Sequence, residues 1–389
     1  MERLVRFILF AFPLLIASIG AHWLIATWAM RVFPRLARHR RAAMILVSLL
    51  VVATPVLRLL TRKTHSSPAN ELLSAMMFEL MLVMLSMPLF ALAIVAGRAF
   101  ARKTATPPAA NGIGRREAIE RIGGLAALGT TGALLGWGMT RGRHAFEVEE
   151  VVVRIEGLPK ALDGYTIAQI SDIHAGVFVG ERELKEGLSR IQETKPDLIV
   201  ATGDLVDFDP RFAAMLARAL SDLRARDGVI AIVGNHDYYS GIHEIVSALD
   251  RAKVEVLMNR GKVIRAGDAG GFALLGVDDL WAPRAGGKGP DLDAAIAMVP
   301  RHVPRILLAH QPNYVAHSAG KVALQLSGHT HGGQINPGFR LASLFLPYIA
   351  GRYDVSGTTL YVNRGFGVAG PPARIGAPPE VSKIVLVAA

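Results

Sequence analysis

The chain of 389 residues is 51% hydrophobic and has a mean hydropathy of +0.34, which is high for a soluble protein, so we expect membrane segments beside one large domain. The net charge of +11 comes from residues 1–145, with 18 Lys and Arg against 5 Asp and Glu, whereas residues 146–389 carry 25 against 27. Basic residues beside apolar segments are topology signals, so the charge implies no nucleic-acid partner. The absence of cysteine excludes disulfides, thiolate metal sites and cysteine nucleophiles.

Four apolar stretches in residues 1–145 are long enough to cross a bilayer as helices, which takes roughly 20 residues. They are Phe7–Met30, Ala42–Leu60, Leu72–Ala96 and Ile122–Met139. The fourth is rich in glycine, which transmembrane helices tolerate, although a surface loop or a soluble helix is the alternative. The sequence therefore predicts a membrane region over residues 1–145 and a separate domain over residues 146–389.

The connecting loops differ in charge, and this difference predicts the topology. Residues 31–41 and 98–121 are rich in Arg and Lys, so both loops are expected on the cytoplasmic side and everything after Met139 outside. Arg115 and Arg116 precede the fourth segment and resemble a twin-arginine export signal. An ordinary pair of topology-setting arginines is the alternative.

After residue 145 short strands alternate with amphipathic helices. The first strand is expected over Glu147–Ile155, where polar and apolar residues alternate. Further expected elements are helices over Glu181–Glu193, Arg211–Ala225 and Ile242–Ala252 and strands over Val254–Met258, Phe272–Val277, Thr359–Val362 and Ser382–Val387. About ten strands with interleaved helices favour a layered α/β sandwich that forms one domain.

Five short clusters rich in Asp and His each follow a run of apolar and β-branched residues. The runs are Tyr165–Ile170, Leu198–Ala201, Val229–Val233, Arg305–Ala309 and Val322–Leu326, and the clusters are Asp172-Ile173-His174, Gly203–Asp207, Gly234–Asp237, His310 and Gly328–His331. Such runs are typical of buried strands, and an open α/β sheet places its active site at the carboxyl ends of its strands. The pattern predicts two divalent metal ions and hydrolytic chemistry.

The residue types suit divalent cations. Asp172 and His174 lie two residues apart at a strand end, so both are expected to reach one metal. Asp204 follows a strand and a glycine and is suited to bridging two cations. His329 and His331 repeat the spacing of two, although on a turn they are also able to serve different metals.

The order of the clusters resembles that of the calcineurin-like metallophosphoesterases, from about residue 150 to the C-terminus, with every motif position present. The apolar segments, the arginine pair and Gly332-Gly333-Gln334 look like the membrane-anchored bacterial branch, in the plasma membrane. The resemblance implies a four-layer αββα sandwich preceded by an all-α transmembrane region. It assigns one metal to Asp172, His174, Asp204 and His331, and the other to Asp204, Asn235, His310 and His329.

The resemblance also implies that His236 faces the scissile phosphate and binds no metal. We expect His236 to stabilise charge or protonate the leaving group, with Asp237 orienting its other ring nitrogen and Asp207 supporting a ligand. Trp281 is expected to be a packed loop aromatic, with a place at the substrate entrance as the alternative. Arg364 is expected to form a structural salt bridge, with a position near a phosphate as the alternative. Mn, Fe, Zn and Mg all accept this ligand set.

The expected function is hydrolysis of a phosphate monoester, diester or pyrophosphate in a small-molecule or lipid-linked substrate at the membrane or envelope. One alternative is a hydrolase similar to the UDP-2,3-diacylglucosamine pyrophosphatases of lipid A synthesis, which requires a cytoplasmic site. Another is a non-catalytic metal-binding module, although a proton donor at His236 has no use there. The sequence leaves the oligomeric state open.

Overall fold

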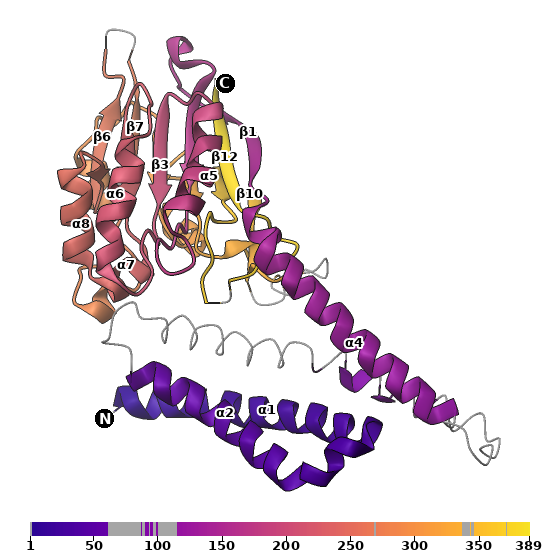
Figure 1. Ribbon diagram of the computed structural model, residues 1–389. Helices are drawn as coiled ribbons and strands as arrows, with labels where there is room; N and C mark the ends of the chain where they lie inside the picture. Colours follow the sequence, from indigo (N-terminus) through magenta and orange to yellow (C-terminus); the bar gives the residue numbers. More distant parts are fainter. Residues whose placement is uncertain are drawn as a thin grey trace. The chain divides into compact units, whose positions relative to one another are not determined.

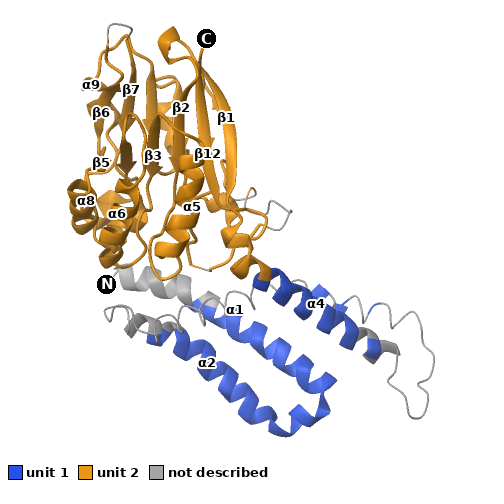
Figure 2. Cartoon of the chain, turned by 45° about the horizontal axis from the view of Figure 1, so that its top comes forward, with its two compact units in different colours: residues 1–136 blue, residues 137–389 orange. Residues whose placement is uncertain are grey.

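A computed structural model describes residues 2–60, 115–267, 270–336, 346–370 and 372–389, with isolated positions at 87, 90–92, 94–95, 99 and 343. The chain divides into two compact units, Met1–Gly136 and Trp137–Ala389 (Figure 2). The expected division into a membrane region over 1–145 and a domain over 146–389 stays a prediction.

Three of the four expected membrane segments are helical. They lie within α1 (Glu2–Val32), α2 (Arg40–Leu60) and α4 (Arg115–Thr140). The 3-10 helix η1 (Pro34–His39) lies between α1 and α2, and most of the expected segment Leu72–Ala96 falls outside the described residues. Among the described helices, the segments Leu15–Val32 and Arg121–His144 are long and apolar enough to cross a membrane.

The second unit contains two six-stranded sheets. The first has the strand order β1-β12-β2-β3-β4-β5, with β2 to β5 parallel and β12 antiparallel to β2. Its strands are β1 (Glu147–Ile155), β2 (Tyr165–Ile170), β3 (Leu198–Thr202), β4 (Val229–Ile232), β5 (Glu255–Val256) and β12 (Glu380–Ala388). The strands β2 and β3 are almost entirely buried, which accounts for their continuous apolar sequence.

The second sheet has the order β10-β11-β9-β8-β7-β6, with an antiparallel strand at each edge. Its strands are β6 (Arg260–Ile264), β7 (Phe272–Gly276), β8 (Arg305–Leu308), β9 (Leu324–Ser327), β10 (Gly351–Val355) and β11 (Thr358–Val362). The edge strands β6 and β10 were not expected from the sequence. Both are partly exposed and rich in Arg, Lys, Gly and Asp, so they lack an apolar run.

The domain has four layers, as expected from the fold class. Apolar side chains of both sheets, such as Ile167 and Leu326, form one core between them. The helices α5 (Glu181–Glu193), α6 (Ala213–Ser221) and α8 (Ile242–Arg251) cover the outer face of the first sheet (Figure 1). Helices α9 (Leu292–Ala297) and α10 (Val315–Ser318) pack on the second sheet. The expected helix Arg211–Ala225 is shorter, because η5 (Pro210–Phe212) precedes α6.

Candidate metal centre

The five clusters come together at the carboxyl ends of β2, β3 and β4 in the first sheet and of β8 and β9 in the second. Parallel strands of one sheet end at the same edge, and the facing sheets bring the two edges together. Clusters separated by as many as 157 residues, such as those of His174 and His331, therefore place their side chains in contact. The site lies within one unit, residues 137–389.

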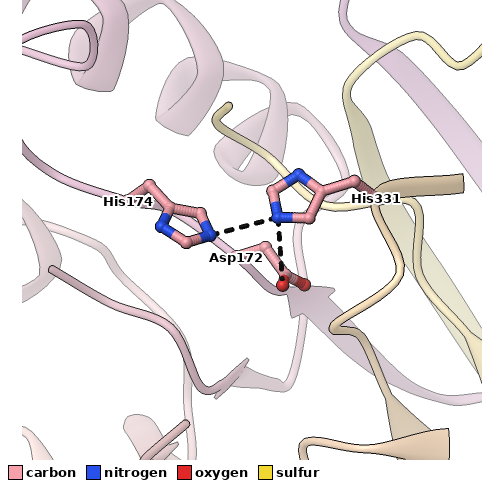
Figure 3. Close-up of side chains that lie close together, drawn as sticks. All are labelled: Asp172, His174 and His331. Atoms are coloured by element: carbon pink, nitrogen blue, oxygen red, sulfur yellow. Dashed lines mark hydrogen bonds and ion pairs between the residues drawn. The ribbon is translucent and has the colours of Figure 1, made fainter. Parts of the chain in front are cut away.

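The first group of possible ligands consists of Asp172, His174 and His331 (Figure 3). His174 Nε2 lies 3.1 Å from His331 Nε2, which in turn lies 3.4 Å from Asp172 Oδ1. All three residues are buried. Burial and the charges of His174 and Arg374 hold the pKa of His331 well below its usual value, so this ring is neutral, the form in which imidazole binds a metal.

The second group consists of Asp204, His310 and His329. His310 Nε2 lies 3.1 Å from Asp204 Oδ2 and 3.2 Å from His329 Nδ1. The other nitrogen of His310, Nδ1, donates a hydrogen bond to the carbonyl oxygen of Thr202 at 2.8 Å, which aims Nε2 into the site. Asp204 Oδ2 is also 3.7 Å from His174 Nε2, so this carboxylate lies between the two groups.

The donor set fits divalent cations. In each group two imidazole nitrogens lie within hydrogen-bond distance of one another, His174 with His331 and His310 with His329. Two ring nitrogens approach in this way when their lone pairs bind the same cation. The side-chain oxygen of Asn235 is buried and has no hydrogen-bond partner among the described residues. An orphaned buried acceptor costs about 1–3 kcal/mol, and a cation would satisfy it. Asn235 begins the helix α7 (Asn235–Ser240), directly after β4.

Five of the possible ligands have left-handed backbone conformations. The φ angles are 52° at Asp172, 49° at His174, 50° at Asp204, 73° at His329 and 53° at His331. This region costs a residue with a side chain on the order of 1–3 kcal/mol, and such residues cluster at functional sites. The hydrogen bond from the His174 amide to the Asp204 carbonyl oxygen, at 3.0 Å, is part of what holds the turns. The residue sequence alone carries no signal for this strain.

His236 lies beside the first group and is held by Asp207. Its Nδ1 is 2.9 Å from Asp207 Oδ1, and its ring is 4.6 Å from that of His174, centroid to centroid. Burial alone would lower the pKa of His236, but the hydrogen bond with Asp207 and the charges of Asp204 and Asp237 raise it to about 9. The ring is therefore protonated at neutral pH.

The expectation that Asp237 orients His236 is wrong, because Asp207 occupies that position. The fully buried carboxylate of Asp237 instead accepts hydrogen bonds from the amides of Gly234 at 2.8 Å, Leu205 at 2.9 Å and Val206 at 3.0 Å. Asp237 is the third residue of α7, and a side chain there turns back toward the helix start. An acidic residue three positions after a helix-initiating glycine is the signal that indicates capping.

Arg374 is a buried cation behind the site that sequence reasoning missed. It is 1% exposed, and its Nη2 lies 3.2 Å from Nδ1 of His331. Burial lowers the pKa of Arg374 to about 9, which leaves it charged at neutral pH. Arg374 lies in a loop 43 residues from His331, so no local pattern joins the two.

Two further expectations have clear outcomes. Arg364 binds Glu380 at 2.7 Å and Glu147 at 3.0 Å, which is the structural salt bridge. Trp281 lies 6.1 Å from His329, ring centroid to centroid, and so borders the site.

Comparison with known proteins agrees with this geometry. Residues 165–333 match the family described as calcineurin-like phosphoesterase. An uncharacterized metallophosphoesterase of Bacillus subtilis, YkuE, is 32% identical over 282 residues, which cover 70% of this chain and 97% of that protein. The chain belongs to the calcineurin-like phosphoesterase family. The four-layer sandwich and the ligand-type residues described above are thus those of a metallophosphoesterase domain.

Other relatives of this metallophosphoesterase extend the comparison. A Danio rerio transmembrane protein with metallophosphoesterase domain is 36% identical over 269 residues, which cover 67% of this chain but only 62% of that protein. A solved 5'-nucleotidase precursor of Thermus thermophilus has a TM-score of 0.36 and 15% identity, over 58% of this chain and 54% of that one. Relatives named transmembrane and two apolar helices indicate membrane association. Because vertebrate relatives match as well, a bacterial branch stays a prediction.

Proposed function

We propose that the chain is a dinuclear metal-dependent phosphoesterase. The observation that supports this most directly is the position of Asp204 between the two groups of possible ligands, 3.1 Å from His310 Nε2 and 3.7 Å from His174 Nε2. A carboxylate so placed has one or both oxygens available to two cations. The first metal would be held by Asp172, His174, Asp204 and His331, and the second by Asp204, Asn235, His310 and His329.

When bound, the divalent ions would acidify a water molecule and neutralise charge on the phosphate. The protein's own contribution is a positioned proton. Asp207 holds Nδ1 of His236, so the Nε2–H group is left to face the substrate. As the ester P–O bond breaks, this proton passes to the leaving oxygen, which departs as a neutral alcohol. Asp237 supports the step indirectly, because it fixes the start of α7.

The proposed substrate is a phosphate monoester, diester or pyrophosphate at the membrane or envelope, with the active site outside the cytoplasm. The apolar segments Leu15–Val32 and Arg121–His144 support the membrane location. A twin-arginine export signal at Arg115 and Arg116 remains part of the proposal, as does a four-span bacterial plasma-membrane topology. A reporter fused to the C-terminus tests the side: activity of a cytoplasm-only reporter would reverse the topology and favour the nucleotide-linked acyl-sugar pyrophosphatase.

The activity is tested with the full-length protein purified in detergent and loaded with Mn²⁺, Zn²⁺ or Mg²⁺. Hydrolysis of an aryl phosphate is expected, and His236→Ala should lower kcat by about 100-fold or more while metal content is unchanged. His243→Ala is the matched control, because His243 is exposed on α8 and outside the site. No turnover with any of these metals would refute the hydrolase and leave the non-catalytic metal-binding module.

A further inference from the structure

Three aromatic side chains border the site on the side of His236, and we refer to Phe208, Tyr239 and Trp281 as the aromatic rim. Ring centroids of Phe208 and Tyr239 lie 5.6 and 5.8 Å from that of His236. Tyr239 is 6.4 Å from Trp281, and Trp281 is 6.1 Å from His329. The rim therefore runs without a break from the proposed proton donor to a possible ligand of the second metal.

Two of the three side chains of the rim are well exposed. Phe208 is 54% exposed and Tyr239 is 43% exposed. Among the described residues of the unit 137–389, the only other aromatic side chain with similar exposure is Trp137 of α4, and both Phe208 and Tyr239 contact His236. Single exposed apolar residues need no explanation, but adjacent ones beside a polar site mark a binding surface.

One ring of the rim, that of Trp281, is also held in place before any ligand binds. The Trp281 amide donates to Asp279 Oδ1 at 2.7 Å, and Gln311 holds the other oxygen of that carboxylate at 2.6 Å. The guanidinium of Arg284 lies over the Trp281 ring, 5.1 Å from its centroid. A ring fixed in this way loses little conformational entropy on binding, so a ligand gains more of the contact energy.

The direction of the rim assigns it to one part of the substrate. His236 is proposed to protonate the leaving oxygen, so the group attached to that oxygen lies beside Phe208 and Tyr239. Aromatic faces bind flat rings by stacking and edge-to-face contact. If the leaving group were a small polar alcohol, it would not cover the rim, and the three aromatic rings would stay exposed to water.

Resting on the proposed function, we infer that the aromatic rim binds the leaving group and that the substrates are phosphate esters whose leaving group carries a flat aromatic ring. The rim selects the substrate, whereas the metals and His236 act in the same way on esters with and without an aromatic ring. This narrows the substrate class from phosphate esters in general to those of aryl or nucleoside type.

The test compares 2-naphthyl phosphate with glycerol 2-phosphate in full-length protein loaded with Mn²⁺. For each variant, kcat/KM for 2-naphthyl phosphate is divided by kcat/KM for glycerol 2-phosphate. The two esters differ in intrinsic reactivity by the same factor in every variant, so a change in this ratio reports a change in the protein. Tyr239→Ala and Trp281→Ala should each lower this ratio about tenfold, through 2-naphthyl phosphate alone. Trp281→Phe should retain most of it, and Met298→Ala, an exposed apolar position on the second sheet's side, should leave it unchanged.

A binding experiment separates this inference from the proposed function. The Kd of 2-naphthylphosphonate, which is not hydrolysed, should rise about tenfold in Trp281→Ala, whereas that of methylphosphonate should not change. Equal ratios in the wild type, Tyr239→Ala and Trp281→Ala would overturn the rim as the leaving-group site. If the wild type hydrolyses neither ester but still prefers the naphthyl phosphonate, the proposed function fails and the ring-binding surface stands.

Discussion

Replacing Arg374 with methionine should destabilise the domain strongly. The guanidinium donates to the carbonyl oxygens of Gly367 at 2.8 Å, Arg364 at 2.8 Å, Ala377 at 3.0 Å and His331 at 3.4 Å. Methionine fills similar volume but donates no hydrogen bond. The His331 carbonyl keeps a hydrogen bond from the Gln334 amide at 2.9 Å, so three carbonyls are left without a donor among the described residues. At about 1 kcal/mol for each of the three, the free energy of unfolding falls by about 3 kcal/mol. For a domain of this size that loss lowers the melting temperature by about 6–12 °C.

The assay is thermal unfolding of full-length protein in detergent, followed by circular dichroism. Arg374→Lys should fall between the wild type and Arg374→Met, because an ammonium group keeps the charge but has only three donors. Arg352→Met is the matched control, since Arg352 is an exposed side chain paired with exposed Asp354 at 3.2 Å, and it should melt within about 2 °C of the wild type. If Arg374→Met also melts within about 2 °C, the buried hydrogen bonds of Arg374 do not support the loop and the reasoning is refuted.

Three further predictions concern the ligands, the proton donor and a tight contact. Asn235→Ala should reduce bound metal from two ions per chain toward one, measured by mass spectrometry of the metal content; two retained ions would exclude Asn235 as a ligand. Asp207→Asn should lower kcat about 10- to 100-fold with metal content unchanged, and an unaltered kcat would show that His236 needs no such partner. Gly142→Ala should lower the melting temperature, because an added Cβ would overlap the Arg374 carbonyl oxygen, whereas Gly132→Ala meets open space and should not; equal melting of both would contradict the contact.

The strands that carry the site could be predicted because they are buried on both faces. A continuous apolar run such as Tyr165–Ile170 is stable only in a strand that other layers of the domain cover on both faces. The structure places β2 at these same bounds. The possible ligands could be predicted because their residue types and their order fit a metal site, and six of them converge in the two groups of His and Asp described above. The edge strands β6 and β10 escaped prediction because an exposed edge needs no apolar pattern.

The partners of the supporting residues could not be predicted, since they depend on contacts far apart in the chain. Asp207 and Asp237 have similar sequence settings, and only the turn of α7 decides that Asp207 contacts His236 while Asp237 caps the helix. Arg374 reaches His331 from a loop without secondary structure. Such contacts leave no periodicity to detect.

The end of α4 sets a practical limit on dividing the protein. The Arg374 amide donates to the carbonyl oxygen of Gly138 at 3.2 Å, and the glycine at 142 lies against the Arg374 carbonyl. A fragment that starts at residue 146 would therefore lose the surface on which the Arg374 loop rests. A fragment meant to fold on its own has to start before Trp137 and keep the last, apolar turn of α4, so it will require detergent or a solubilising substitution at Trp137.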